Sequence, residues 1–280
     1  MFADALALRG LEGGLLYTAL GVFFGATLVG FRVVGGRRRG RALRSMLLIG
    51  LGVLTLDLLA IGIVEGHLPL VTRAELLVLL AWSVALITWA SDRRAHSHEL
   101  TAAVVPAIAL LVAFALFVPP PSTAPAGLRN TGTVLHVLFA IAGCAAVTFA
   151  AGMGALYLWQ IRKLKQDPTA AVASRLPPLE TVDRLNFRSA AWGVALLALS
   201  LVIGWAFIPA SAESLQAWFL DPTVLAVSVG LLVYALLFAA RAWLGWRGRR
   251  AALLSVIGFF VVVVGGAAVA AFCQQSAHLS

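Results

Sequence analysis

Residues 131–165 read TGTVLHVLFAIAGCAAVTFAAGMGALYLWQIRKLK and decide the fold class. The first 29 of these residues, 131–159, contain no Asp, Glu, Lys or Arg, and the stretch then ends in the basic segment 160–165. A helix needs about 20 mostly apolar residues to cross a hydrocarbon core of about 30 Å. This stretch therefore predicts a transmembrane helix whose basic end faces the cytoplasm.

The composition of the whole chain agrees with this stretch. Of its 280 residues 61% are hydrophobic and 12% are charged, and the mean hydropathy is +0.96. Such a chain is typical of a polytopic membrane protein in a lipid bilayer. A net charge of +9 would suggest nucleic-acid binding in a soluble protein, but here the basic residues lie in short loops and indicate orientation. We expect no nucleic-acid partner.

The apolar stretches predict an all-α fold, a bundle of eight transmembrane helices, because helices satisfy their own backbone polar groups in lipid. No connection is long enough for a soluble domain, so residues 1–280 are expected to form a single membrane domain. The predicted spans are 13–35, 45–63, 73–91, 100–118, 131–159, 189–209, 222–241 and 251–272.

Basic residues are distributed very unequally between the two sides of these spans. The segments that connect successive spans alternate between the two sides of the membrane. The segments on one side contain 18 of the 21 Arg and Lys residues, and those on the other side contain only Arg9, Arg73 and Arg129. Short cytoplasmic loops carry the excess of positive charge. This distribution places both termini outside the cytoplasm.

Local signals mark where several helices begin. Thr72 and Glu75 have capping-box spacing at the start of the third span, and Asp221 followed by Pro222 is typical of the start of the seventh. Before the sixth span, the apolar spacing from Leu179 to Phe187 predicts a short amphipathic helix on the inner membrane surface.

The predicted topology sorts the five histidines. His67, His136 and His278 are placed at the outer face, and His96 and His98 in an inner loop. A neutral imidazole is a good ligand for iron or zinc. Each histidine also has a simpler interpretation, as a hydrogen-bonded interfacial residue or a solvated loop residue. Asp57 interrupts the second span, where a carboxylate is costly unless it is protonated, paired or faces a polar cavity.

An ordered set of motifs in the second half carries a family resemblance. The set runs from Leu135-His136-Val137 through the basic exit 160–165 and the segment 176–188 to Trp218 and Asp221-Pro222, and then through residues 232–259. It resembles the cytochrome c assembly family of membrane haem-handling proteins, the CcsA and CcmC type with a tryptophan-rich WWD loop. It is more similar to a shorter, eight-helix branch known as HemX or YpjD-like. The resemblance covers residues 131–280.

The resemblance implies a factor that holds or delivers haem at the outer face of the membrane. It implies a multi-pass protein of the bacterial inner membrane, and a haem chaperone or assembly factor more than an enzyme. It implies transient haem b, with apocytochrome c and a second membrane assembly protein of the ResB/CcsB kind as partners. By this resemblance, His136 and His278 are the axial ligands of the haem iron. Trp218 and Asp221 belong to the aromatic loop that lies against the porphyrin. If haem binds there, Arg73 and Arg129 are the basic residues available to pair with its propionates.

A second function stays open at this point. The family's loop usually has several tryptophans, whereas Trp218 stands nearly alone here. This difference favours a non-catalytic regulator or scaffold of the HemX kind, acting on glutamyl-tRNA reductase in tetrapyrrole synthesis.

Overall fold

A computed structural model describes residues 2–34, 40–64, 66–95, 98–118, 131–166, 176–207, 222–246 and 248–265. In these ranges all regular structure is helical, with eight α-helices and one π-helix and no strand. Six of the described helices are long and apolar enough to cross a membrane. The all-α, multi-pass class is thus confirmed, while the count of eight spans and the outer placement of both termini stay predictions.

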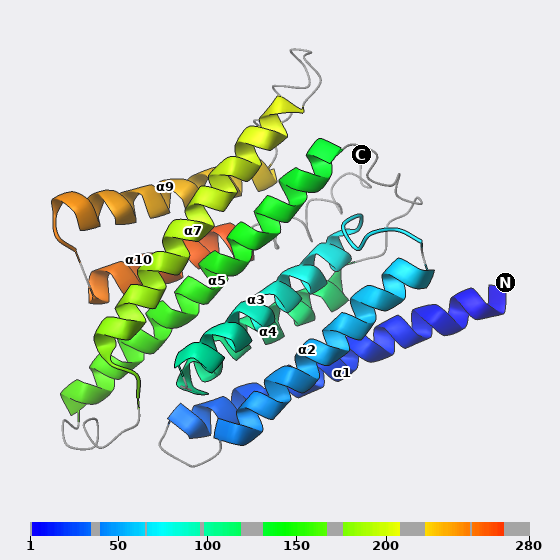
Figure 1. Cartoon of the computed structure of the whole chain (residues 1–280), viewed down its shortest axis with the longest axis horizontal. Coiled ribbons are helices and arrows are strands. Elements are labelled where there is room, and N and C mark those ends of the chain that lie inside the picture. The colour runs from blue at the N-terminus through cyan, green and yellow to red at the C-terminus, as the bar shows by residue number, and fades with distance from the viewer. Residues whose placement is uncertain are drawn as a thin grey trace. The chain divides into compact units, whose positions relative to one another are not determined.

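The chain divides into two compact units, Met1–Leu128 and Arg129–Ser280. That all 280 residues form one membrane domain stays a prediction. Four helices make up the first unit: α1 Phe2–Val34, α2 Gly40–Val64, α3 Arg73–Ala95 and α4 His98–Phe117. In this unit α1 packs against α2 and α4, and α3 packs against α4 and α2 (Figure 1).

The burial pattern of α2 shows that one face of the helix packs inside the unit while the rest of its surface is exposed. Its buried residues recur every three or four positions and form one stripe: Leu43, Leu47, Gly50, Leu54, Asp57 and Ile61. Large apolar side chains such as Leu56 and Ile63 are exposed on the rest of the helix. A helix with an apolar exposed face is suited to contact with lipid. Asp57 is only 1% exposed, so it points into the unit and not toward lipid.

The start of α3 has the predicted cap. The backbone N–H of Glu75 donates to Thr72 Oγ1 at 3.2 Å, and Glu75 Oε2 accepts from the backbone N–H of Val71 at 3.0 Å. Two backbone donors that the helix itself leaves unpaired are satisfied in this way. The capping prediction is therefore confirmed, with the glutamate reaching one residue further back than expected.

The second unit is built on two long helices. They are α5 Thr131–Gln166 and α7 Leu179–Ala206, which pack along each other (Figure 1). Against them lie α9 Pro222–Trp243, α10 Arg249–Phe259 and the π-helix η1 Phe260–Gly265. The start of α9 at Pro222 agrees with the predicted first-turn proline, whereas Asp221 lies outside the described residues.

The predicted surface helix before the sixth span is wrong. Residues 179–206 form a single continuous helix, α7. Val182 is fully buried, and Phe187 packs edge-to-face on Phe238 of α9 with ring centroids 5.3 Å apart. The apolar spacing that suggested a membrane surface is used instead to pack the first turns of α7 against the protein.

Candidate functional site

His136 is fixed to the neighbouring helix by two hydrogen bonds. Its Nδ1–H donates to the backbone oxygen of Ser200 at 2.7 Å, and the Ser200 hydroxyl donates to the backbone oxygen of His136 at 2.9 Å. The Ser200 Oγ atom also lies 3.1 Å from Nδ1. Both residues are carried by rigid helices, His136 by the second turn of α5 and Ser200 by the last turns of α7.

The first of these bonds determines which ring nitrogen carries the hydrogen when the imidazole is neutral. A carbonyl oxygen only accepts, so Nδ1 must carry the hydrogen in this geometry. The lone pair of a neutral imidazole is then on Nε2, the atom available to bind iron. Metal-binding histidines are commonly oriented in this way, by a backbone carbonyl or carboxylate on the other ring nitrogen. The residues present thus fit one axial ligand of a haem iron.

Small residues allow α7 to approach the imidazole closely. A Cβ atom on Gly204 would lie 2.9 Å from both Nδ1 and Cε1 of His136, too close for either to stay in place. One turn before His136, a Cβ on Gly132 would overlap the ring of Phe207. Further along the pair, a Cβ on Gly143 would lie 3.0 Å from the backbone oxygen of Gly193. Close packing through small residues is typical of helix pairs in membranes.

The length of α5 separates this imidazole from the basic end of the helix. His136 and Arg162 are 26 positions apart, which corresponds to roughly 39 Å at 1.5 Å per residue. A hydrocarbon core is about 30 Å thick. If α5 crosses the bilayer, His136 lies at the membrane face opposite Arg162.

The structure places only part of the predicted site. His136 belongs to the second unit, and Arg73 is an exposed residue at the start of α3 in the first unit. The other four predicted site residues lie outside the described residues: His278, Trp218, Asp221 and Arg129. Their roles stay predictions.

Two other histidines have local partners. His67 Nδ1 lies 3.0 Å from the backbone oxygen of Leu68, and His98 Nδ1 lies 3.4 Å from Asp92 Oδ2. No group of three His, Cys, Asp or Glu side chains within the described ranges could hold a metal ion. For His98 the contact agrees with the simpler structural interpretation, whereas the His67 contact is to a backbone oxygen, like that of His136, and does not distinguish the two interpretations.

Ser200, Gly204 and a buried asparagine of α7 are features that the residue-by-residue interpretation missed. Asn186 is 2% exposed, its Nδ2 donates to the backbone oxygen of Ala150 at 2.7 Å, and its Oδ1 accepts from Ser255 Oγ at 3.2 Å. The Tyr234 hydroxyl donates in turn to the backbone oxygen of Ser255 at 3.1 Å. This network joins α5, α7, α9 and α10. A polar residue in an apolar stretch was the available signal for Ser200, whereas Asn186 lies among the charged residues Asp183, Arg184 and Arg188 and no comparable signal marks it.

Comparison with known proteins adds independent information on the family. The model of the family "Cytochrome C assembly protein" matches residues 70–271, which is well over half of the chain and begins before α3. The resemblance noted above started only at residue 131, so the match extends to two further helices.

Individual relatives agree with the family match. The chain is 28% identical to the cytochrome c biogenesis protein CcsA of Prochlorococcus marinus subsp. pastoris strain CCMP1986, over 75% of this chain and 74% of the relative. It is 27% identical to the CcsA of P. marinus strain MIT 9303, over 84% and 83% of the two chains. No solved structure is significantly similar. On the strength of the family match, the chain belongs to the cytochrome c assembly protein family.

Proposed function

We propose that this protein is a membrane haem-handling factor of cytochrome c biogenesis that holds haem at the outer face of the membrane, with His136 as an axial ligand. The observation that carries the proposal is the 2.7 Å bond from His136 Nδ1 to the Ser200 backbone oxygen. In the neutral ring this bond leaves the lone pair on Nε2 and holds that atom in a fixed direction, as an iron ligand requires. Family membership makes cytochrome c biogenesis the setting of this chemistry.

In this function haem is cargo, and the protein contributes binding and position. His136 binds the iron, and α7 holds the ring through Ser200 and leaves room for it at Gly204. We infer that His278 is the second axial ligand and that the loop with Trp218 and Asp221 covers the porphyrin. Arg73 and Arg129 are proposed to neutralise the propionates of haem b.

We further propose that the acceptor is apocytochrome c, which supplies the thiols for attachment. A second membrane assembly protein of the ResB/CcsB kind is the proposed partner, and the bacterial inner membrane the proposed location. The alternative function, a HemX-like regulator of tetrapyrrole synthesis, has no support from the matched relatives, which are named for cytochrome c biogenesis.

The absorption spectrum of the purified protein tests the proposal. The full chain from haem-replete cells is expected to show a Soret band that is lost in His136→Ala. His67→Ala is the matched control, because His67 lies in a loop of the first unit and the family resemblance assigns it no ligand role. Added imidazole should restore the band in His136→Ala by replacing the missing ligand. A wild-type protein without the band, or an unchanged spectrum in His136→Ala, would contradict the proposal.

A further inference from the structure

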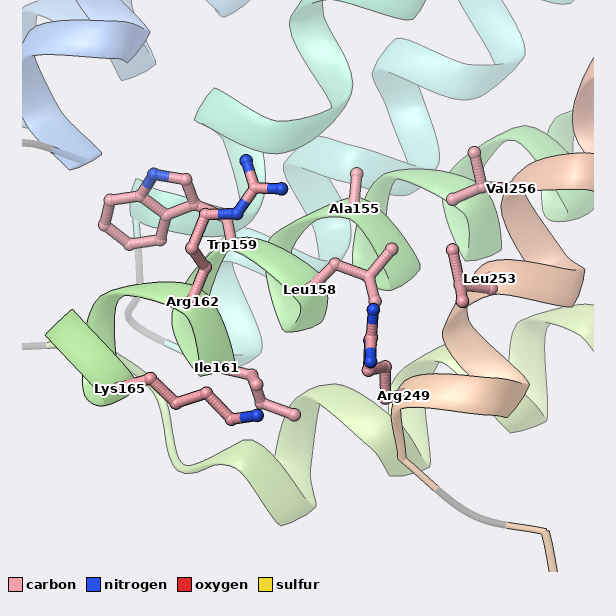
Figure 2. A pocket seen from close by; sticks show the side chains of 9 residues that line it. All are labelled: Ala155, Leu158, Trp159, Ile161, Arg162, Lys165, Arg249, Leu253 and Val256. Carbon is pink, nitrogen blue, oxygen red and sulfur yellow. The ribbon is translucent and has the colours of Figure 1, made fainter.

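A groove lies between the C-terminal turns of α5 and the start of α10, and no function considered so far uses it. Its volume is about 470 Å³, within the range of small-molecule sites. Figure 2 shows that α5 contributes Leu158 and Ile161 to its walls, and that α10 contributes Leu253 and Val256. The walls are therefore mostly apolar.

Three basic side chains also line this groove. They are Arg162 and Lys165 of α5 and Arg249 of α10, and no acidic side chain is found among the described residues that line it. Figure 2 shows Lys165 and Arg249 approaching from the two different helices. Three like charges on one small site repel each other unless an anion neutralises them. The groove thus combines a cationic end with an apolar interior.

Aromatic residues indicate that this end of the unit lies at the membrane–water boundary. Lys163 Nζ lies over the Trp159 ring, 5.0 Å from its centroid, and the Arg250 guanidinium lies over the Trp246 ring at the same distance. Tryptophan and basic residues are enriched together at membrane interfaces. The charge distribution predicts that this boundary is the cytoplasmic one.

We propose that the groove binds an anionic phospholipid. The phosphate would lie among Arg162, Lys165 and Arg249, and an acyl chain would run along Leu158 and Leu253. A free phosphate would leave the apolar walls exposed, and a neutral lipid would leave the three cations without a counter-charge. Basic pockets between helices on the cytoplasmic side suit anionic headgroups. A lipid seated here contacts α5 and α10 at once and braces one against the other.

Native mass spectrometry of the full-length protein tests this proposal, with phosphatidylglycerol and phosphatidylcholine as probes. Phosphatidylglycerol should be retained in preference to phosphatidylcholine. Neutralising one basic residue near a membrane surface weakens anionic-lipid binding about fivefold, so Lys165→Gln with Arg249→Gln should weaken it by roughly twenty-fivefold. The matched control is Arg94→Gln with Arg188→Gln, which removes the same charge from exposed positions that do not line the groove.

A second variant separates the shape of the groove from its charge. Ala155→Trp fills the groove without changing any charged residue, and it should also abolish the preference for phosphatidylglycerol. Excess inorganic phosphate should not displace the lipid. Equal retention of both lipids, equal loss in the control pair, displacement by phosphate, or full retention in Ala155→Trp would each overturn the proposal. Circular dichroism and a monodisperse elution profile establish that each variant is folded.

Discussion

The backbone oxygen of Ser200 lies 2.7 Å from Nδ1 of His136, so the last turns of α7 orient an imidazole that α5 carries. The contact joins residues 64 positions apart in the chain. The position of the proposed ligand His136 therefore depends on the packing of α7, in which no described residue is itself proposed as a ligand.

The first prediction concerns the space beside this ring. Gly204→Val should push the imidazole away, because a Cβ on Gly204 would lie 2.9 Å from two of its atoms. Mutations of residues that orient a metal ligand cost about 10-fold to 100-fold in affinity. The affinity for haem, measured by titration of the haem-free protein, should fall by this amount although His136 is intact, and the haem content of the purified protein should fall with it. Gly52→Val is the control, since nothing lies within 4 Å of a Cβ there, and equal haem content in both variants would refute the prediction.

The second prediction ranks the two bonds of the pair. Ser200→Ala removes the hydroxyl bond to the His136 backbone oxygen and keeps the carbonyl bond to Nδ1. A hydrogen bond contributes about 1 kcal/mol, or a factor of about five. Ser200→Ala should therefore lower haem affinity less than Gly204→Val does, as measured by titration of the haem-free protein. An effect as large as that of His136→Ala would show that the hydroxyl, and not the carbonyl, holds the ring.

The third prediction addresses the crossing of α5 and α7. A Cβ on Gly193 would lie 2.7 Å from Val147 Cγ2 and 3.0 Å from the backbone oxygen of Gly143. Overpacking of this kind costs about 1–3 kcal/mol. Gly193→Ala should lower the free energy of unfolding in detergent titration, even though alanine favours helices. In the control, Gly21→Ala, a Cβ meets nothing within 4 Å, so stability should stay equal or rise.

How much of this arrangement the sequence predicts depends on the range of the interaction. Apolar run length and basic ends predict the described helices and the class, since each helix in lipid satisfies its own backbone. The capping contacts of Thr72 and Glu75 are also local, and they are present. The apolar spacing from Leu179 to Phe187 predicts a helix on the membrane surface, and this prediction is wrong. An apolar helix face has the same sequence pattern whether it contacts lipid or packs against a neighbouring helix.

Long-range contacts could not be predicted by spacing. The bond between His136 and Ser200 depends on the register of two helices, which residue types alone do not fix. The family resemblance predicted His136 as a ligand but not the residue that orients it. Ser200 becomes recognisable only when the C-terminal turns of α7 are placed beside the second turn of α5.

The fourth prediction concerns the buried polar network in the second unit. Asn186 bonds to the backbone oxygen of Ala150 and accepts from Ser255. Side-chain hydrogen bonds between membrane helices contribute about 0.6 kcal/mol on average and up to about 1.7. Asn186→Leu should destabilise the protein by more than Ser255→Ala, which removes one bond of the network. The double variant should be less unstable than the sum of the two, because the residues share a bond. Additive losses would show that the bond contributes nothing.

The fifth prediction concerns the pair formed by Asp92 and His98 in the first unit. The carboxylate of Asp92 is fully buried and lies 3.4 Å from His98 Nδ1, with Arg44 close enough to add a favourable charge. Only Asp92 of this pair is fully buried, and the His98 side chain is 31% exposed, so breaking the pair should cost about 1–3 kcal/mol, between the values for exposed and buried pairs. His98→Ala should therefore lower the free energy of unfolding by this order, and much less in an Asp92→Asn background. Arg184→Ala is the control, since its pair with Glu180 is largely exposed and such pairs contribute at most about 1 kcal/mol. Zinc should leave the stability of the wild type unchanged if the contact with Asp92 is the whole role of His98. Stabilisation by zinc that disappears in His98→Ala would contradict this.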